Sequence, residues 1–367
     1  MTGSSRLASV VAAGLLLVLA APAAPGRADA ERSAQWHLAF LDIARVQQIS
    51  QGEGVTVAVI DSGVNGNHPD LAGNVVSGRN FLPGHPDNGW DDTVGHGTGM
   101  AGLIGAHGHD RSDGVLGIAS RAKIFPVQTM SATDHGTPDL DAAGIDAAVR
   151  QGAKVISMSI GDAESSILRE SVARAEGADV VIVAAVGNKP EDGEVTFPAR
   201  YDGVVAVGAV DRNGNHADIS VTGRQVLISA PGVDIESAAN GNLYRTGTGT
   251  SDATAITAGV VALIRAKFPT LPAAEVIHRL TATATDKGPK GRDDEYGYGI
   301  VNPYAALTAD VPPLAASASP SATPTQASSK QAPASGSRAG PVIAAALGTA
   351  AVLVTILIVV TRRRATT

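Results

Sequence analysis

Three short segments of the chain carry the residue types of nucleophilic catalysis. Asp61 follows the apolar run at residues 55–60, His96 lies in the glycine-rich segment GHGTGMAG, and Ser251 ends the segment TGTGTS. A serine hydroxyl is a poor nucleophile until a base accepts its proton, and histidine can do this near neutral pH. A carboxylate can then orient the imidazole and stabilise its charged form. Together, these residues could attack a carbonyl carbon and expel an amine.

Each of the three residues also has an ordinary structural interpretation. An aspartate at the end of a strand usually accepts hydrogen bonds within its own turn. A single histidine is most often a satisfied structural residue. The apolar residues between 256 and 268 have helical spacing, which places Ser251 at a helix N-terminus. Serine is a common helix cap there. The same position also suits a nucleophile, because backbone amides and the positive end of the helix dipole are close.

Apolar runs rich in β-branched residues alternate with helical patterns between residues 31 and 310. The runs predict strands that are buried on both faces, as in a parallel sheet covered by helices, and the class is therefore α/β. Functional residues of such sheets gather at the carboxyl ends of the strands. The predicted strands are residues 55–60, 122–127, 155–160, 180–185, 204–210 and 226–230, and the predicted helices include 138–151 and 165–177.

The three motifs, in the order Asp, His, Ser, resemble the signatures of the subtilisin-like serine proteases, or subtilases, which have this chain order. The resemblance covers roughly residues 50–307. It implies a subtilisin-like three-layer fold with a mostly parallel central sheet, and a serine endopeptidase that acts on polypeptides with Asp61, His96 and Ser251 as its catalytic triad. Further similar segments are VISMSIG at 155–161, AAVGN at 184–188, FPA at 197–199 and YGYG at 296–299.

The resemblance also implies the residues that bind the substrate and the oxyanion. The side-chain amide of Asn188 and the backbone amide of Ser251 would donate to the oxyanion, and each such donor accelerates the reaction by ~10² to 10³. Taken alone, Asn188 could equally be a turn residue at a strand end. The residues expected to pair with the substrate and to wall its primary pocket are Ser159, Ile160, Gly161, Ala185, Val186 and Gly187. The resemblance implies no cofactor.

The chain departs from the usual subtilase pattern next to the nucleophile. Asp252 stands where subtilases usually have Met or Phe, and Ile256 stands where Pro is expected. A carboxylate near His96 would raise the pKa of its imidazole. Alternatively, Asp252 points into solvent and only complements the helix dipole. Val186 replaces a common Ala and would narrow the pocket.

The first 30 residues have the pattern of a secretory signal peptide. A segment with Arg6 precedes an apolar run at residues 7–20, and the small-residue stretch that follows ends at Ala30. This order of a basic, an apolar and a small-residue region is typical of signal peptides. We therefore expect the mature chain to begin near residue 31, with the peptidase domain at residues 31–310.

The C-terminal part has the pattern of a tethered membrane anchor. Residues 311–340 are rich in Ala, Ser and Pro and contain no acidic or aromatic residue, which predicts an unpacked linker. Residues 341–360 carry no charge and, as a helix, would span about 30 Å of hydrocarbon. Arg362, Arg363 and Arg364 follow. They predict a cytoplasmic tail at 361–367 and a catalytic domain outside the cell membrane.

The short N-terminal extension, the linker and the predicted span together resemble the mycosins, which are membrane-anchored subtilases associated with type VII secretion. This resemblance implies three partners: polypeptide substrates, the cytoplasmic membrane and a type VII secretion complex. It also implies that the protease processes secreted proteins near the membrane. A scaffold of a secretion complex, either non-catalytic or with both roles, is the alternative, because a fold alone does not guarantee activity.

Composition excludes several other classes. The formal net charge is −7, and the basic residues near the C-terminus conceal a more acidic body, which would repel nucleic acid. The absence of cysteine excludes disulfides and thiolate nucleophiles. Two polar loops could hold a metal, but a solvated loop is the commoner case and no metal is predicted. The residues concerned are His107, His109, Asp110 and Asp113 in one loop, and Asp87, Asp91 and Asp92, as calcium ligands, in the other.

Overall fold

In a computed structural model of the chain, residues 27–84, 87–110, 113–132 and 136–314 are described. They lie in a unit that ends at Ala315. The predicted membrane span at 341–360, its cytoplasmic tail and almost all of the predicted linker and signal peptide lie outside the described residues. Among the described helices, none is both long enough and apolar enough to cross a membrane.

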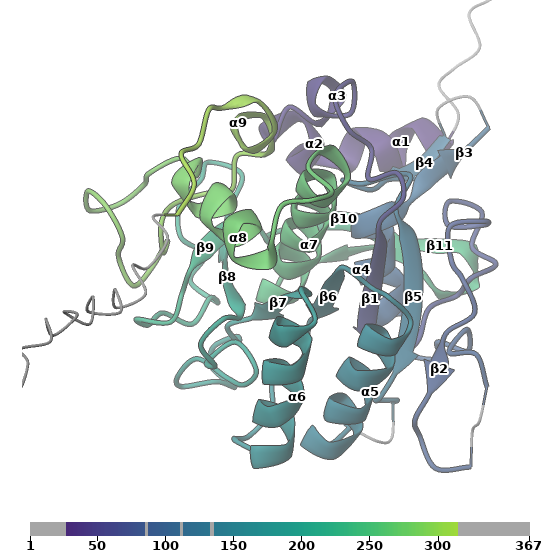
Figure 1. Cartoon of the computed structure of the whole chain (residues 1–367). Coiled ribbons are helices and arrows are strands. Elements are labelled where there is room, and N and C mark those ends of the chain that lie inside the picture. The colour runs from purple at the N-terminus through teal and green to yellow at the C-terminus, as the bar shows by residue number, and fades with distance from the viewer. Residues whose placement is uncertain (1–26, 85–86, 111–112, 133–135, 315–367) are drawn as a thin grey trace, which may run out of the picture. The chain divides into compact units, whose positions relative to one another are not determined.

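The central sheet has seven strands in the order β2-β5-β1-β6-β7-β8-β9, and all neighbouring strands are parallel (Figure 1). β1 lies between β5 and β6, with Thr56 opposite Lys123 and Val57 opposite Val155. The predicted mostly parallel sheet is therefore confirmed. The strands are β1 (Thr56–Asp61), β2 (Arg79–Asn80), β5 (Lys123–Gln128), β6 (Val155–Met158), β7 (Val181–Ala185), β8 (Val205–Val210) and β9 (Ile228–Pro231).

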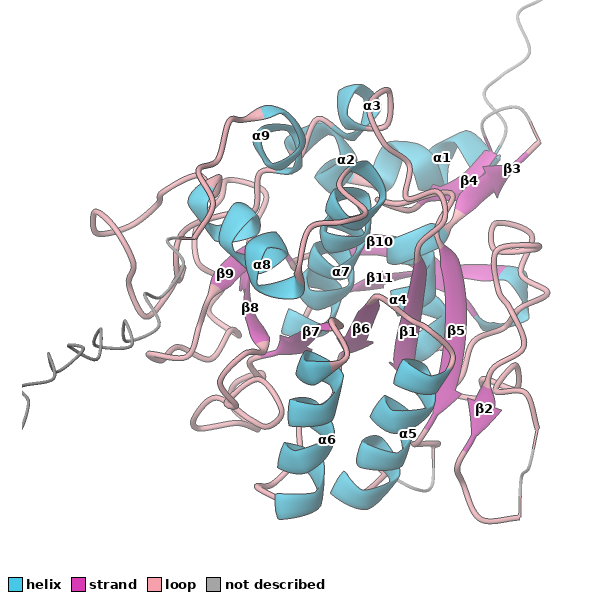
Figure 2. Cartoon of the chain, viewed as in Figure 1, coloured by secondary structure: helices cyan, strands magenta, loops and turns pink. Residues whose placement is uncertain are grey.

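Helices cover both faces of this sheet (Figure 2). Successive side chains of a strand point to opposite faces, and β1 shows this directly. Val57 and Val59 join the core beneath α4 (His96–Gly105) and α7 (Thr250–Lys267). Ala58 and Ile60 join the core beneath α5 (Pro138–Arg150) and α6 (Ser166–Gly177). The architecture is an α/β fold of three layers, which agrees with the class predicted from the sequence pattern and with the layers implied by the resemblance.

The N-terminal residues of the described chain pack on the same body. Helix α1 (Arg27–Ala34) continues across the predicted signal-peptide boundary, and α2 (Trp36–Phe40) and α3 (Ile43–Val46) follow. Gln35 donates to the carbonyl of Leu116 at 3.0 Å, and Trp36 donates to that of Val233 at 3.0 Å. The segment before β1 is thus an integral part of the domain.

The remaining elements complete the domain around the central layers. Two antiparallel pairs lie outside the central sheet, and two helices, α8 and α9, contribute to the core beneath α7. These elements are β3 (His107–His109) with β4 (Asp113–Leu116), β10 (Ile235–Ala239) with β11 (Leu243–Gly247), the short 3₁₀ helix Asn240–Asn242, α8 (Ala273–Ala282) and α9 (Pro303–Thr308).

Candidate active site

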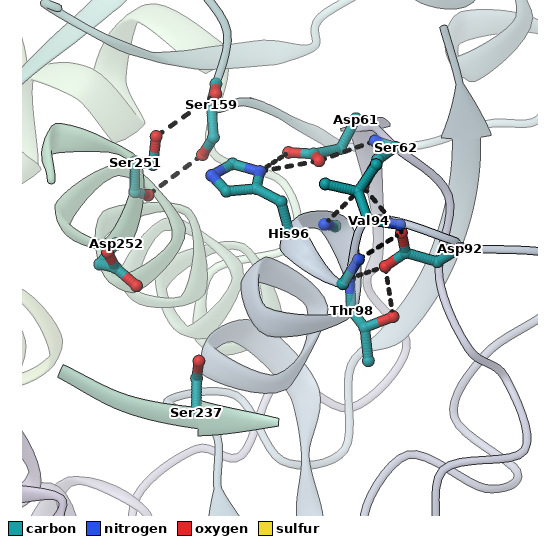
Figure 3. Close-up of polar contacts among 12 residues, drawn as sticks. Asp61, Ser62, Asp92, Val94, His96, Thr98, Ser159, Ser237, Ser251 and Asp252 are labelled. Atoms are coloured by element: carbon teal, nitrogen blue, oxygen red, sulfur yellow. Dashed lines mark hydrogen bonds and ion pairs between the residues drawn. The ribbon is translucent and has the colours of Figure 1, made fainter. Parts of the chain in front are cut away.

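Segments far apart in the sequence meet where the central strands end. Asp61 is the last residue of β1, and Ser159 follows directly after the end of β6. His96 begins α4, and Ser251 lies in the first turn of α7. Figure 3 shows the imidazole of His96 between Asp61 on one side and the Ser159–Ser251 pair on the other. The site therefore lies at the carboxyl edge of the sheet, where the sequence placed it.

Asp61 holds His96 through one ring nitrogen. Nδ1 of His96 lies 2.8 and 2.9 Å from the two carboxylate oxygens of Asp61, which is fully buried. The backbone N–H of Ser62 donates to the same carboxylate at 2.7 Å. Because an ionised carboxylate only accepts, Nδ1 carries the hydrogen and Nε2 is left as the acceptor of the neutral ring. This is the tautomer that a general base requires.

The environment of His96 raises its pKa above the usual value. Burial acts most strongly and would lower the pKa, but the charge of Asp61 and its hydrogen bond to the ring raise it and together prevail. Arg245 lowers the pKa and Asp252 raises it by smaller amounts. The imidazolium form is therefore stabilised, chiefly by Asp61.

Ser251 is anchored to Ser159 by a reciprocal contact. Its hydroxyl donates to the carbonyl of Ser159 at 3.4 Å, and the hydroxyl of Ser159 donates to the carbonyl of Ser251 at 3.1 Å. Among the described residues, the hydroxyl of Ser251 thus bonds to Ser159 rather than to His96. Hydrogen bonds to a catalytic base are often long in unliganded enzymes and tighten when substrate binds.

Asn188 follows β7 and is oriented by the start of α7. Its Oδ1 accepts from the backbone N–H of Thr250 at 2.9 Å and from the hydroxyl of Thr250 at 3.2 Å. The side-chain oxygen is thereby fixed, and the Nδ2 amide is left as the donor. The backbone N–H of Asn188 donates to Asp192 at 2.8 Å. The side chain therefore bridges two distant segments instead of closing its own turn.

The six residues predicted to bind substrate lie after β6 and around the end of β7. Ile160 is half-buried and Gly161 is exposed, whereas Ala185, Val186 and Gly187 are buried. A cavity of about 420 Å³ is lined by residues that follow these segments, among them Asp162, Asp192 and Thr196. Val186 packs in the core that α5 and α6 cover, with no exposed surface. Val186 therefore does not line this cavity, and the narrowing of the substrate pocket expected from Val186 stays a prediction.

The structure adds Asp92, whose role the sequence did not predict. Asp92 is buried, and one carboxylate oxygen accepts from the N–H groups of Val94 and Gly95 at 3.0 and 2.8 Å. The other accepts from the N–H and hydroxyl of Thr98 at 2.9 and 2.6 Å. Ser62 also donates to Asp92, at 2.9 Å. These bonds cap α4 and fix the start of the helix that carries His96, and they occupy the carboxylate that the sequence analysis considered as a calcium ligand.

The second polar loop brings three predicted residues together. Ligand atoms of His109, Asp110 and Asp113 lie within 4.8 Å of one another. His109 also contacts the buried carboxylate of Asp70 through Nδ1. His107 instead bonds to the backbone carbonyl of Ala72 at 2.9 Å. Exposed acidic groups often gather without a metal, so our prediction for this loop stays a solvated polar loop without a bound metal ion.

Comparison with known proteins decides the family. The Subtilase family matches residues 52–299, which is more than half of the chain. The chain is a subtilase. Subtilisin DY of Bacillus licheniformis is 39% identical to this subtilase over 260 residues, which cover 70% of the chain and 92% of that protein. Subtilisin Savinase of Lederbergia lenta is 39% identical over 256 residues, covering 70% of the chain and 91% of that protein.

Solved structures of MycP1 are also similar to this subtilase. MycP1 with its N-terminal propeptide removed shares 31% identity, with a TM-score of 0.69 over 76% of this chain and 98% of that chain. MycP1 from Mycobacterium smegmatis shares 29% identity, with a TM-score of 0.67 over 76% of this chain and 85% of that chain. The protein is thus a serine endopeptidase with a subtilisin-like fold, and mycosins are among its structural relatives.

Proposed function

We propose that this subtilase cleaves peptide bonds through Asp61, His96 and Ser251, with Asn188 as an oxyanion donor. The observation that carries the proposal is the doubly hydrogen-bonded Nδ1 of His96, which leaves Nε2 free to accept a proton beside Ser251. The fixed Oδ1 of Asn188 supports it, because the opposite end of that amide is then presented as a donor next to the start of α7.

The reaction would proceed in two halves. The Oγ of Ser251 attacks the peptide carbonyl while Nε2 of His96 takes its proton, and the carbonyl oxygen becomes an oxyanion that accepts from Nδ2 of Asn188 and from the N–H of Ser251. Asp61 stabilises the imidazolium without taking the proton. The intermediate collapses, and His96 delivers the proton to the leaving amine. Water then releases the acyl group by the same steps and restores the Ser251 hydroxyl.

The proposed setting is the outer face of the cell membrane, where the protease would process secreted proteins. The support is the sequence: a signal peptide at 1–30, a linker at 311–340, an uncharged segment at 341–360 and the arginines after it. A further support is the likeness to a structure described as MycP1 from the ESX-1 type VII secretion system. In cells freed of their wall, added protease should then release the catalytic domain without permeabilisation of the membrane.

Hydrolysis by the purified full-length chain tests the proposed activity. The wild type should cleave casein or a quenched fluorescent peptide, and Ser251→Ala should lose this activity while its circular dichroism and Tm stay close to those of the wild type. Ser171→Ala is a suitable control, because its hydroxyl bonds within α6, to the carbonyl of Leu168, and takes no part in the proposed reaction. Equal hydrolysis by the wild type and Ser251→Ala would contradict the proposal.

A further inference from the structure

Asp252, the residue after the proposed nucleophile, is buried and ion-paired. Its exposed fraction is 2%, so the interpretation in which it points into solvent is wrong. Its Oδ1 accepts from Nη2 of Arg245 at 2.7 Å. Arg245 belongs to β11, and its Nε donates to the hydroxyl of Ser237 in the neighbouring strand β10 at 3.2 Å. The carboxylate is thus joined to an arginine from another element of the fold.

Glycines make the space that the guanidinium of Arg245 occupies. A Cβ atom on Gly99 of α4 would lie 2.6 Å from its Nε. A Cβ atom on Gly247 would lie 2.8 Å from its Nη2 and 2.9 Å from Oδ2 of Asp252. Contacts this close would force the arginine to move. The guanidinium therefore lies between α4, which begins at His96, and the first turn of α7, which contains Ser251.

The two charges of the pair act on His96 in opposite directions. The charged groups around its ring are Asp61 from β1, Arg245 from β11 and Asp252 from α7. Among the effects on the pKa of His96, that of Arg245 lowers it and is larger than that of Asp252, which raises it. Burial raises the pKa of Asp252 itself, and Arg245 and His96 oppose that rise. Arg245 thus both favours the ionised form of Asp252 and offsets its charge at the imidazole.

We propose that Arg245 and Asp252 form a positioning pair that joins the first turn of α7 to the β10–β11 hairpin beside α4 and balances the charge that Asp252 places near His96. The proposal rests on the proposed function, because it assigns the pair its effect through the general base. Neither residue needs to touch the substrate. The pair acts by fixing where Ser251 and His96 lie and at which pH His96 is neutral.

The test is the pH dependence of kcat/KM for Asp252→Asn, Arg245→Gln and the double variant. The acidic limb of this profile is the fall of kcat/KM as His96 becomes protonated. Without Asp252, the unbalanced charge of Arg245 disfavours the imidazolium, so the acidic limb should move to lower pH by about 0.5 to 1 unit. Without Arg245, the limb should move to higher pH by a similar amount. The double variant should lie between the two single variants. The proposal is overturned if the three limbs coincide, or if Asp252→Asn moves the limb upward.

Two further variants separate a charge effect from loss of structure. Arg245→Lys keeps the positive charge but not the planar fork, so its limb should stay close to that of the wild type while kcat falls. Arg265→Gln removes a buried arginine from the other end of α7, so it should lower Tm without moving the limb. If Arg265→Gln moved the acidic limb as far as Arg245→Gln does, the shift in Arg245→Gln would reflect loss of structure and not the charge of Arg245.

The experiment also distinguishes this proposal from the function on which it rests. A fluorophosphonate probe is applied to the wild type before the kinetics. If the folded wild type does not react at Ser251, the proposed function is wrong. If it reacts at Ser251 and the variants share one pH profile, the catalytic assignment stands and the positioning pair is wrong.

Discussion

Helix α7 has an arginine–aspartate pair at each end, and the two pairs differ in which partner is buried. At the N-terminal end, the side chain of Asp252 is 3% exposed and that of Arg245 is 28% exposed. At the C-terminal end, the side chain of Arg265 is 3% exposed and that of Asp179 is 45% exposed. The pair beside the proposed reaction centre therefore buries its aspartate, whereas the pair at the far end of the helix buries its arginine.

The surroundings of Asp179 and Asp252 shift the pKa values of these two carboxylates in opposite directions. For Asp179, burial opposes ionisation, but the N–H of Ala273 at 2.6 Å and the guanidinium of Arg265 outweigh it and lower its pKa. For Asp252, burial prevails and the pKa is raised. A group with a lowered pKa in the folded state stabilises the fold when ionised, and one with a raised pKa does not. The C-terminal pair serves stability, whereas the N-terminal pair keeps a costly charge close to His96.

The largest effect is expected at the N-terminal end of α7, for a substitution of Asn188, which contacts Thr250 in the first turn of that helix. Asn188→Ala should lower kcat by ~10² to 10³ with little change in KM, because an oxyanion donor acts mainly in the transition state. Steady-state kinetics with a peptide substrate measures this. Thr250→Val removes one hydroxyl bonded to Oδ1 of Asn188 but keeps the backbone N–H bond, so it should lower kcat far less than Asn188→Ala. A defect confined to KM would remove Asn188 from the proposed role.

A change at the C-terminal end should separate stability from activity. Arg265→Gln removes hydrogen bonds to Asp179 and to the carbonyl of Leu271, which lie 3.1 and 2.8 Å from the guanidinium. We expect a loss of about 1–3 kcal/mol in the free energy of unfolding, with kcat/KM unchanged at temperatures where the variant is folded. Urea denaturation and peptide hydrolysis measure the two quantities. If activity fell while stability stayed the same, the contrast between the ends of α7 would be lost.

The smallest expected effect is an upward shift of the acidic limb in the pH profile of kcat/KM for the wild type. His96 must be neutral to accept the proton of Ser251, so kcat/KM should fall as pH drops through the pKa of His96. Because that pKa is raised, the limb should lie above the usual value of about 6.5. A pH profile at constant ionic strength measures it. A limb below pH ~6 would mean that burial outweighs the interaction with Asp61.

The sequence predicted the parts of the site that depend on local signals. A β-branched run followed by Asp61 places a carboxylate at a strand end, and the helical spacing after Ser251 places that residue in a first turn. Both predictions follow from patterns within one segment. The family resemblance then connected Asp61, His96 and Ser251, which no single segment could do.

The contacts that the sequence did not predict depend on segments meeting in space. Arg245 lies on a two-stranded hairpin, where a charged residue is usually solvated, and only the packing of α4 and α7 brings it to Asp252. Asp92 lies in an acidic loop, and its capping of α4 depends on how that loop turns back. The alternative in which Asp252 points into solvent is wrong for the same reason: Arg245, which binds Asp252, comes from a distant segment.

Covalent labelling of Ser251 tests the central claim most directly. The full-length chain is treated with a fluorophosphonate probe, digested and analysed by mass spectrometry, with Ser251→Ala and Asp61→Asn treated in parallel. The account predicts modification of the wild type at Ser251, none at that position in Ser251→Ala, and much slower modification in Asp61→Asn, because only a serine activated through His96 reacts readily. A folded wild type that is unmodified, or modified at another serine, would contradict the proposed catalytic site.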